Sequence, residues 1–164
     1  MEKTVILLNG PSSSGKSTLS RVLQMLIAQK RAQHYGIISI DDFMKLATDE
    51  TIYEDDVYEI NEEMCLAAEE ILKNSPGVII DHVITSQRIF RQLMDLLGKF
   101  QIRTVHVHCP LEVLLQRENA RGNRCIGSAE ASYTYLYPQD GYDLTVDNAT
   151  ATPEENAALI CRLL

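Results

Sequence analysis

Apolar residues along this chain follow two patterns that alternate. Short continuous runs rich in Val, Ile and Leu predict strands at residues 4–9, 36–40, 78–80, 102–108 and 143–146. Between and after them, apolar positions recur every three or four residues and predict helices at residues 16–29, 56–73, 86–99, 110–120 and 153–164. Residues 122–141 show neither pattern, and we expect them to be irregular.

This alternation of strands and helices indicates the fold class. A strand, a helix and a second strand form a right-handed crossover, which produces a parallel sheet with helices on both faces. The strands are apolar throughout, as is typical of strands that are buried on both faces. Because no internal repeat or linker interrupts the chain, we predict one α/β domain spanning residues 1–164.

Composition and charge narrow the classes of function. The 164 residues contain 15 Lys and Arg against 23 Asp and Glu, a formal net charge of −8, which argues against binding nucleic acid or an acidic membrane surface. No apolar run is long enough for a membrane helix or a secretion signal, so we expect a cytoplasmic protein. We expect free thiols rather than disulfides or a zinc site at the four scattered cysteines, Cys65, Cys109, Cys125 and Cys161.

The segment between the first predicted strand and helix has the phosphate-loop pattern G-x-x-x-x-G-K-[ST]. It comprises Gly10, Pro11, Ser12, Ser13, Ser14, Gly15, Lys16 and Ser17, followed by Thr18. The glycines let the backbone close around a phosphate, and the helix N-terminus adds a favourable dipole. In this pattern Lys16 reaches the β- and γ-phosphates and the Ser17 hydroxyl binds Mg²⁺. We therefore predict a site for ATP and Mg²⁺, the alternative being an ordinary Gly/Ser turn before a helix.

Carboxylates follow two further strands, at the same edge of the sheet as the phosphate loop. Asp81 ends the 78–80 strand and is a candidate Mg²⁺ ligand, with a loop cap as its alternative role. Asp41 and Asp42 follow the second strand. We assign Asp41 as the base that takes a proton from a substrate hydroxyl, and we expect Asp42 to cap the next helical turn.

Three arginines gather within eight residues near the end of the 110–120 helix: Arg117, Arg121 and Arg124. Guanidinium groups stabilise the charge of a transferring phosphoryl group. We assign Arg117 to nucleotide binding and Arg121 and Arg124 to catalysis, the alternative being a solvated basic helix end. Because no guanine-reading Asn/Thr-Lys-x-Asp motif follows, the pattern favours a small-molecule kinase with an arginine-bearing lid at about residues 119–141.

Several segments, in this order along the chain, resemble the chloramphenicol phosphotransferase family. They are residues 8–17, Asp41 at its strand end, residues 78–83, residues 117–124 and residues 142–148. The resemblance implies a three-layer P-loop fold with strand order 2-3-1-4-5 and an ATP-dependent kinase acting on a hydroxyl of a small molecule, in the family's named case an antibiotic. It also places the family's base at Asp41 and its lid arginines at Arg117, Arg121 and Arg124.

Two positions on the substrate side depart from the family's pattern. His82 stands where the family tends to have an acidic residue, and Tyr137 stands where it has a lid histidine. We take Asp42, His82 and Tyr137 as candidate contacts to the acceptor, while the tyrosines of the lid could either stack on a ligand or pack the lid. The alternatives to an antibiotic kinase are a nucleotide, nucleoside or shikimate-type kinase and an ATP-binding regulatory or toxin-like module.

Overall fold

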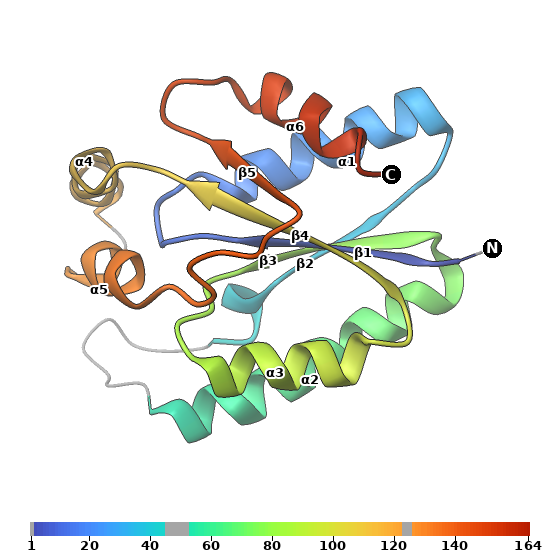
Figure 1. Ribbon diagram of the computed structural model, residues 1–164, viewed down its shortest axis with the longest axis horizontal. Helices are drawn as coiled ribbons and strands as arrows, with labels where there is room; N and C mark the ends of the chain where they lie inside the picture. Colours follow the sequence, from blue (N-terminus) through green and yellow to red (C-terminus); the bar gives the residue numbers. More distant parts are fainter. Residues whose placement is uncertain (1, 45–52, 123–125) are drawn as a thin grey trace.

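The computed structural model describes residues 2–44, 53–122 and 126–164, in which strands and helices alternate as predicted (Figure 1). In chain order the elements are β1 (Thr4–Asn9), α1 (Lys16–Arg31), β2 (Gly36–Ser39), η1 (Ile40–Asp42), α2 (Glu54–Asn74), β3 (Gly77–His82), α3 (Gln87–Leu97), β4 (Gln101–His108), α4 (Leu111–Arg121), α5 (Ser128–Tyr135), β5 (Leu144–Asp147) and α6 (Pro153–Cys161). No helix within these ranges is both long and apolar enough to cross a membrane.

The five strands form one parallel sheet in the order β2-β3-β1-β4-β5, which confirms the predicted topology. The central strand is β1, where Thr4 pairs with Gly77 of β3 and with Gln101 of β4. Because all strands run in one direction, their carboxyl ends share one edge of the sheet. Helices α4 and α5 lie beyond this edge (Figure 1).

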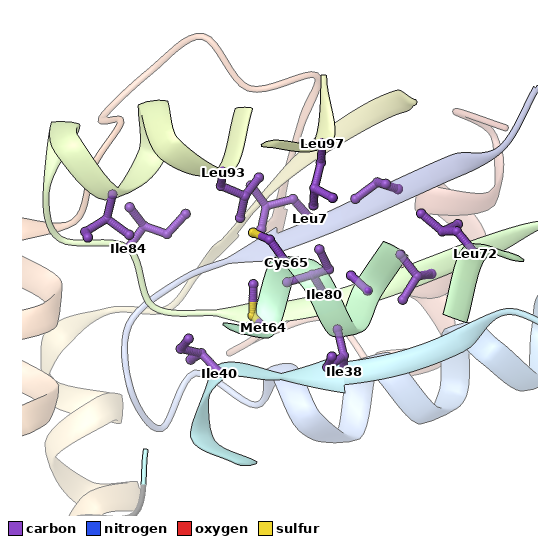
Figure 2. Close-up of a cluster of buried hydrophobic side chains, with 14 residues drawn as sticks. Leu7, Ile38, Ile40, Met64, Cys65, Leu72, Ile80, Ile84, Leu93 and Leu97 are labelled. Carbon is purple, nitrogen blue, oxygen red and sulfur yellow. The ribbon is translucent and has the colours of Figure 1, made fainter. Parts of the chain in front are cut away.

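Side chains of β1 alternate between two apolar cores, as the pleat of a strand requires. Val5 and Leu7 pack with α2 and α3 in the cluster shown in Figure 2. Ile6 and Leu8 pack with α1 and α6 on the opposite face. The sheet is therefore covered on both sides, which leaves its carboxyl edge as the open side of the fold.

Helix α5 is a correction to the sequence prediction, because it lies inside the segment 122–141 that we expected to be irregular. Its buried positions are Ala129 and Ser132, which are too small and too polar to mark an apolar face. The segment for which we predict a lid, at about residues 119–141, thus holds the end of α4 and all of α5, and we call these two helices the lid helices.

Strand β3 also extends beyond its predicted end. Asp81 and His82 pair with Leu8 and Asn9 of β1 instead of lying in a loop. Because both side chains are polar, a prediction based on an apolar run did not include them in the strand. Their pairing with β1 places them beside the start of the phosphate loop.

Of the four cysteines, the structure describes Cys65, Cys109 and Cys161, and all three are free thiols. Cys125 lies outside the described residues. The first two are buried, so they act as small apolar side chains in the packing.

Candidate active site

The phosphate loop, residues 10–17, leaves β1 and enters α1 at the carboxyl edge of the sheet. A Cβ on Gly10 would lie 2.5 Å from the carbonyl oxygen of Val107, and one on Gly15 would lie 2.6 Å from Nδ2 of Asn148. Gly15 also has a φ of 89°, in the left-handed region that favours glycine. Both glycines are thus required by the close approach of neighbouring groups.

The loop carries polar groups that suit an anion. Ser13, with a φ of 70°, lines the cavity described below, and its buried Oγ has no hydrogen-bond partner within the described chain. Lys16 is buried, and its Nζ donates to the carbonyl oxygen of Pro11 at 2.9 Å, across the loop. A buried hydroxyl without a partner and a lysine ammonium at the loop fit the phosphates of a nucleotide.

Ser17 and Asp81, the predicted Mg²⁺ ligands, lie side by side. Ser17 Oγ donates to Asp81 Oδ2 at 2.9 Å, and Lys16 Nζ lies 4.0 Å from Asp81 Oδ1. Hydroxyl and carboxylate oxygens are ligands that Mg²⁺ accepts, with water and substrate phosphates supplying the others. Among the residues that the structure describes, no three His, Cys, Asp or Glu gather to hold a metal ion. The pair therefore fits an ion that is held jointly with nucleotide phosphates.

A cavity of about 1330 Å³ extends from the phosphate loop along the carboxyl edge to α2 and α3. Its nucleotide half is lined by the phosphate loop, by Thr18 and by Arg117 and Arg121 of α4. The other half, which we call the acceptor half, has an apolar wall made of Ile40, Met44, Val57, Val83 and Ile89. Polar residues line it beside this wall, namely Asp41, Glu54, His82, Thr85 and Ser86. Because one drug-sized ligand occupies roughly 300–1,000 Å³, the cavity has room for a nucleotide beside a small acceptor.

The structure separates the two neighbouring carboxylates that follow β2. Asp41 lines the cavity, whereas Asp42 is not among the described residues that line it. The turn that we expect Asp42 to cap extends beyond residue 44, outside the described residues, so this role stays a prediction. The preceding turn, η1, ends at Asp42 and is capped by Ser39, whose Oγ accepts the N–H of Asp41 at 3.3 Å. Asp41 is thus the carboxylate of this pair that faces the same cavity as the phosphate loop.

The lid arginines lie on α4. Arg117 donates through Nη2 to the carbonyl oxygen of Asn148 at 2.9 Å and through Nη1 to that of Ser13 at 3.5 Å. This holds Arg117 against the phosphate loop, while Arg121 lines the cavity at the end of the helix. Arg124 lies outside the described residues.

A buried glutamate joins the two helices of the lid. Glu118 is 5% exposed, and its Oε1 accepts the N–H of Gly127 at 3.1 Å while its Oε2 accepts the N–H of Ala129 at 2.8 Å. The carboxylate thereby caps the N-terminus of α5. Sequence reasoning missed this role, although an acidic residue between Arg117 and Arg121 was a signal that could have been followed.

His82 is fully buried at the end of β3, and both of its ring nitrogens have protein partners. Nδ1 accepts the N–H of Val83 at 2.9 Å, so Nε2 carries the proton and donates to Asn61 Oδ1 at 2.8 Å. Asn61 donates onward to Gln92 Oε1 at 2.7 Å, and Gln92 donates to the carbonyl oxygen of Tyr58 at 2.8 Å. Burial lowers the pKa of His82 to about 3, so the ring lines the cavity in its neutral form.

Asn9, at the end of β1, ties the segment after α5 to the sheet. Its Nδ2 donates to the carbonyl oxygen of Tyr137 at 3.0 Å and to the hydroxyl of Tyr142 at 2.9 Å, and its Oδ1 accepts the N–H of Ile84 at 2.9 Å. The Tyr137 ring packs edge-on against Phe90, with 5.8 Å between centroids. Tyr137 is not among the described residues that line the cavity, so its contact with the acceptor stays a prediction.

The other lid tyrosines have different surroundings. Tyr135 is exposed and lines the cavity, whereas Tyr133 borders a small groove beside His108. Tyr142 stacks on His106 with 5.0 Å between ring centroids. Of these three, Tyr135 has the position from which a ring can contact a ligand.

Solved structures with this fold include P-loop kinases. The chain is similar to the APS kinase of Mycobacterium tuberculosis in complex with AMPPNP and APS, with a TM-score of 0.77 and 16% identity over 99% of this chain and 97% of that chain. It is also similar to the shikimate kinase of Acinetobacter baumannii in complex with shikimate, with a TM-score of 0.64 and 19% identity over 98% and 92% of the two chains. The tunicamycin resistance protein of Deinococcus radiodurans shares the fold with a TM-score of 0.66 and 18% identity over 98% and 95%.

The sequence itself points to a family. No curated protein matches the chain. The family described as chloramphenicol phosphotransferase-like protein matches residues 3–164, which is nearly the whole length. This match confirms the resemblance carried by the motifs, and together with the P-loop kinase fold it supports a phosphotransferase of the kinase type. The chain belongs to the chloramphenicol phosphotransferase-like protein family.

Proposed function

We propose that the protein transfers the γ-phosphoryl group of ATP to a hydroxyl group of a small molecule. The observation that carries this proposal is that Asp41, after β2, and the phosphate loop with Lys16, after β1, line one cavity. A phosphate loop alone fits any nucleotide-binding protein. A carboxylate in the same cavity fits the removal of a proton from an attacking hydroxyl.

The nucleotide half of the cavity binds the phosphates in this proposal. Backbone N–H groups of the loop and the Lys16 ammonium surround the β- and γ-phosphates. Arg117 and Arg121 approach from the lid and stabilise the charge that develops on the transferring group, and the sequence assigns Arg124 the same task. Mg²⁺, when bound at Ser17 and Asp81, neutralises phosphate charge.

Asp41 acts on the acceptor. It accepts the proton of the acceptor hydroxyl, whose oxygen then forms a bond to the γ-phosphorus. The bond between that phosphorus and the β–γ bridging oxygen breaks, and ADP leaves with the electron pair. The products are the phosphorylated alcohol and ADP, with the proton on the Asp41 carboxyl.

The acceptor half of the cavity favours an uncharged molecule with an apolar body. Its described polar lining includes Asp41, Glu54 and the neutral ring of His82, beside the apolar wall. The described basic residues of the cavity lie on the phosphate loop, α1 and α4: Lys16, Arg21, Arg117 and Arg121. An anionic acceptor such as shikimate would meet carboxylates here. We therefore propose a chloramphenicol-like alcohol, and with it antibiotic modification.

A phosphorylation screen tests this function. The purified protein is incubated with Mg²⁺ and ATP and with chloramphenicol, uncharged nucleosides or shikimate, and ADP release and product mass are measured. We expect phosphorylation of chloramphenicol or another uncharged alcohol. Turnover with shikimate alone would overturn the proposed acceptor. ATP binding without stimulation by any acceptor would overturn the kinase proposal and favour a regulatory or toxin-like ATP-binding module.

The role of Asp41 has its own test. We expect Asp41→Asn to lower kcat by about 10²–10⁴, the usual size of a general-base contribution, while the Kd for ATP changes by less than about threefold. Asp42→Asn should lower kcat far less, and Asp95→Asn on the exposed side of α3 serves as a matched control. The assignment is wrong if Asp41→Asn weakens only ATP binding, or if Asp42→Asn lowers kcat equally.

A further inference from the structure

Three consecutive residues of the phosphate loop are held from outside by three different elements. The contacts are Ser12 N–H to Ser132 Oγ of α5 at 2.9 Å, Arg117 Nη1 of α4 to the Ser13 carbonyl oxygen at 3.5 Å, and Asn148 Nδ2 to the Ser14 carbonyl oxygen at 2.7 Å. The third contact is the shortest of these. It comes from a buried side chain directly after β5 that no step of the proposed reaction uses.

Asn148 is itself held by hydrogen bonds to three other residues. Its backbone N–H donates to the carbonyl oxygen of His108 at 2.9 Å, and its own carbonyl oxygen accepts Nη2 of Arg117 at 2.9 Å. Its side-chain Oδ1 accepts Nδ2 of Asn156, a buried residue of α6, at 3.0 Å. Because Asn156 Nδ2 can only donate, the amide of Asn148 must present Nδ2 to Ser14.

The contact with Ser14 determines how the next backbone group points. The Ser14 carbonyl and the Gly15 N–H belong to one trans peptide, so they point in opposite directions. With the carbonyl bound to Asn148, the Gly15 N–H points away from Asn148, as a donor to a bound phosphate must. The missing Cβ of Gly15 makes this possible, since it would lie 2.6 Å from Asn148 Nδ2.

We propose that Asn148, supported by Asn156, is a positioning residue that presets the Ser14–Gly15 peptide for nucleotide phosphates. A loop that is already in its bound conformation loses less conformational entropy when the ligand arrives, so the nucleotide binds more tightly. This inference deepens the proposed function and rests on it. In this proposal Asn148, which follows β5, and Asn156 of α6 contribute to ATP binding without contacting the nucleotide.

Two substitutions test the proposal through nucleotide affinity. Asn148→Asp keeps an oxygen for Asn156 but loses the donor to Ser14, and Asn148→Ala loses the donor without adding charge. We expect both to raise the Kd for Mg²⁺–ADP, measured calorimetrically without acceptor, by about tenfold or more, and to raise the KM for ATP similarly. The KM for the acceptor and kcat at saturating ATP should change by less than about threefold.

A charge control and a folding control accompany these variants. Asn74→Asp adds the same charge at the exposed end of α2, on the opposite edge of the sheet, and should leave the Kd for ADP unchanged. Loss of folded protein would lower the apparent kcat at constant KM, whereas loss of positioning raises the KM for ATP. Thermal unfolding of each variant checks the fold, and Asn148→Ser replaces any variant that does not fold.

The outcomes separate this inference from the function on which it rests. A Kd for ADP within about twofold of wild type in folded Asn148 variants would overturn the inference. An equal loss of affinity in Asn74→Asp would overturn it too. A wild-type protein that binds no ADP would instead overturn the proposed function.

Discussion

The hydroxyl of Ser17 hydrogen-bonds to the carboxylate of Asp81 at 2.9 Å, which joins the first turn of α1 to the end of β3. The register of β1 and β3 places Asp81 near the phosphate loop, because Asp81 pairs with Leu8, two residues before the loop begins at Gly10. The two oxygens that we propose as metal ligands therefore lie on a helix and on a strand, not on a loop.

This relationship predicts the effect of Asp81→Asn on the metal requirement. Asparagine can still accept the hydrogen bond of Ser17, but it lacks the negative charge that attracts Mg²⁺. We expect the Mg²⁺ concentration for half-maximal activity to rise by about tenfold or more. A Mg²⁺ titration of activity measures this, and an unchanged midpoint would show that Asp81 does not hold the ion.

Lys16→Ala should remove most of the activity while the protein stays folded. The ammonium of Lys16 lies across the phosphate loop, so its loss removes one preorganised charge at the transferring group, worth about 10²–10³ in kcat. Steady-state kinetics measures the loss, and Lys30→Ala at the exposed end of α1 is the matched control. Unchanged phosphoryl transfer in Lys16→Ala would contradict the role of the phosphate loop.

Glu118→Gln should loosen the lid. The side-chain amide of glutamine places an NH₂ group against the backbone N–H of either Gly127 or Ala129, at the start of α5. Two donors then face each other at a buried position, which costs about 1–3 kcal/mol. Faster hydrogen exchange of the α5 amides measures this loss locally. Glu112→Gln, on the exposed first turn of the same helix, should leave the exchange unchanged. Equal exchange rates in both variants would show that Glu118 does not anchor α5.

Stability should fall in alkaline solution because of Cys65. Burial, followed by the charges of Glu69 and Glu62, raises the pKa of this thiol from 9.0 to about 12. The unfolded chain therefore loses the proton first, so stability is complete below pH 9 and declines between pH 9 and 12, by at most about 1.4 kcal/mol per pH unit. Urea unfolding at pH 8 to 10 measures the decline.

The comparison variant for this titration is Cys65→Ala, which has no thiol to ionise. Its free energy of unfolding will be lower at pH 8 because of the smaller side chain, but it should decline less steeply above pH 9. Equal slopes in the two proteins would mean that another group causes the alkaline loss.

The parts of this molecule that could be predicted from sequence are those with local signatures. The phosphate loop combines two glycines, Lys16 and Ser17 within eight residues, and each apolar strand is a continuous run. The position of Asp41 and Asp81 near the phosphate loop could be predicted because parallel strands place their carboxyl ends at one edge of the sheet. The strand order came with the resemblance, not from the pattern.

The contacts that complete the site lack any such local signature. Asn148 and Ser14 are 134 positions apart, so no local pattern links them. An asparagine directly after a strand is also typical of an ordinary turn. Helix α5 has small buried residues and no apolar stripe, so its pattern resembled a loop. Asn61 sits on a long amphipathic helix, where nothing in the sequence distinguishes a buried asparagine from an exposed one.

The buried chain His82–Asn61–Gln92 limits how the acceptor specificity can be altered by mutation. Each member is the hydrogen-bond partner of the next, so replacing one of them alone leaves a buried polar atom without a partner. Mutant libraries aimed at new acceptors should therefore keep these three residues together. They should randomise Val57 and Ile89, whose side chains line the acceptor half of the cavity and are apolar, so they make no side-chain hydrogen bonds.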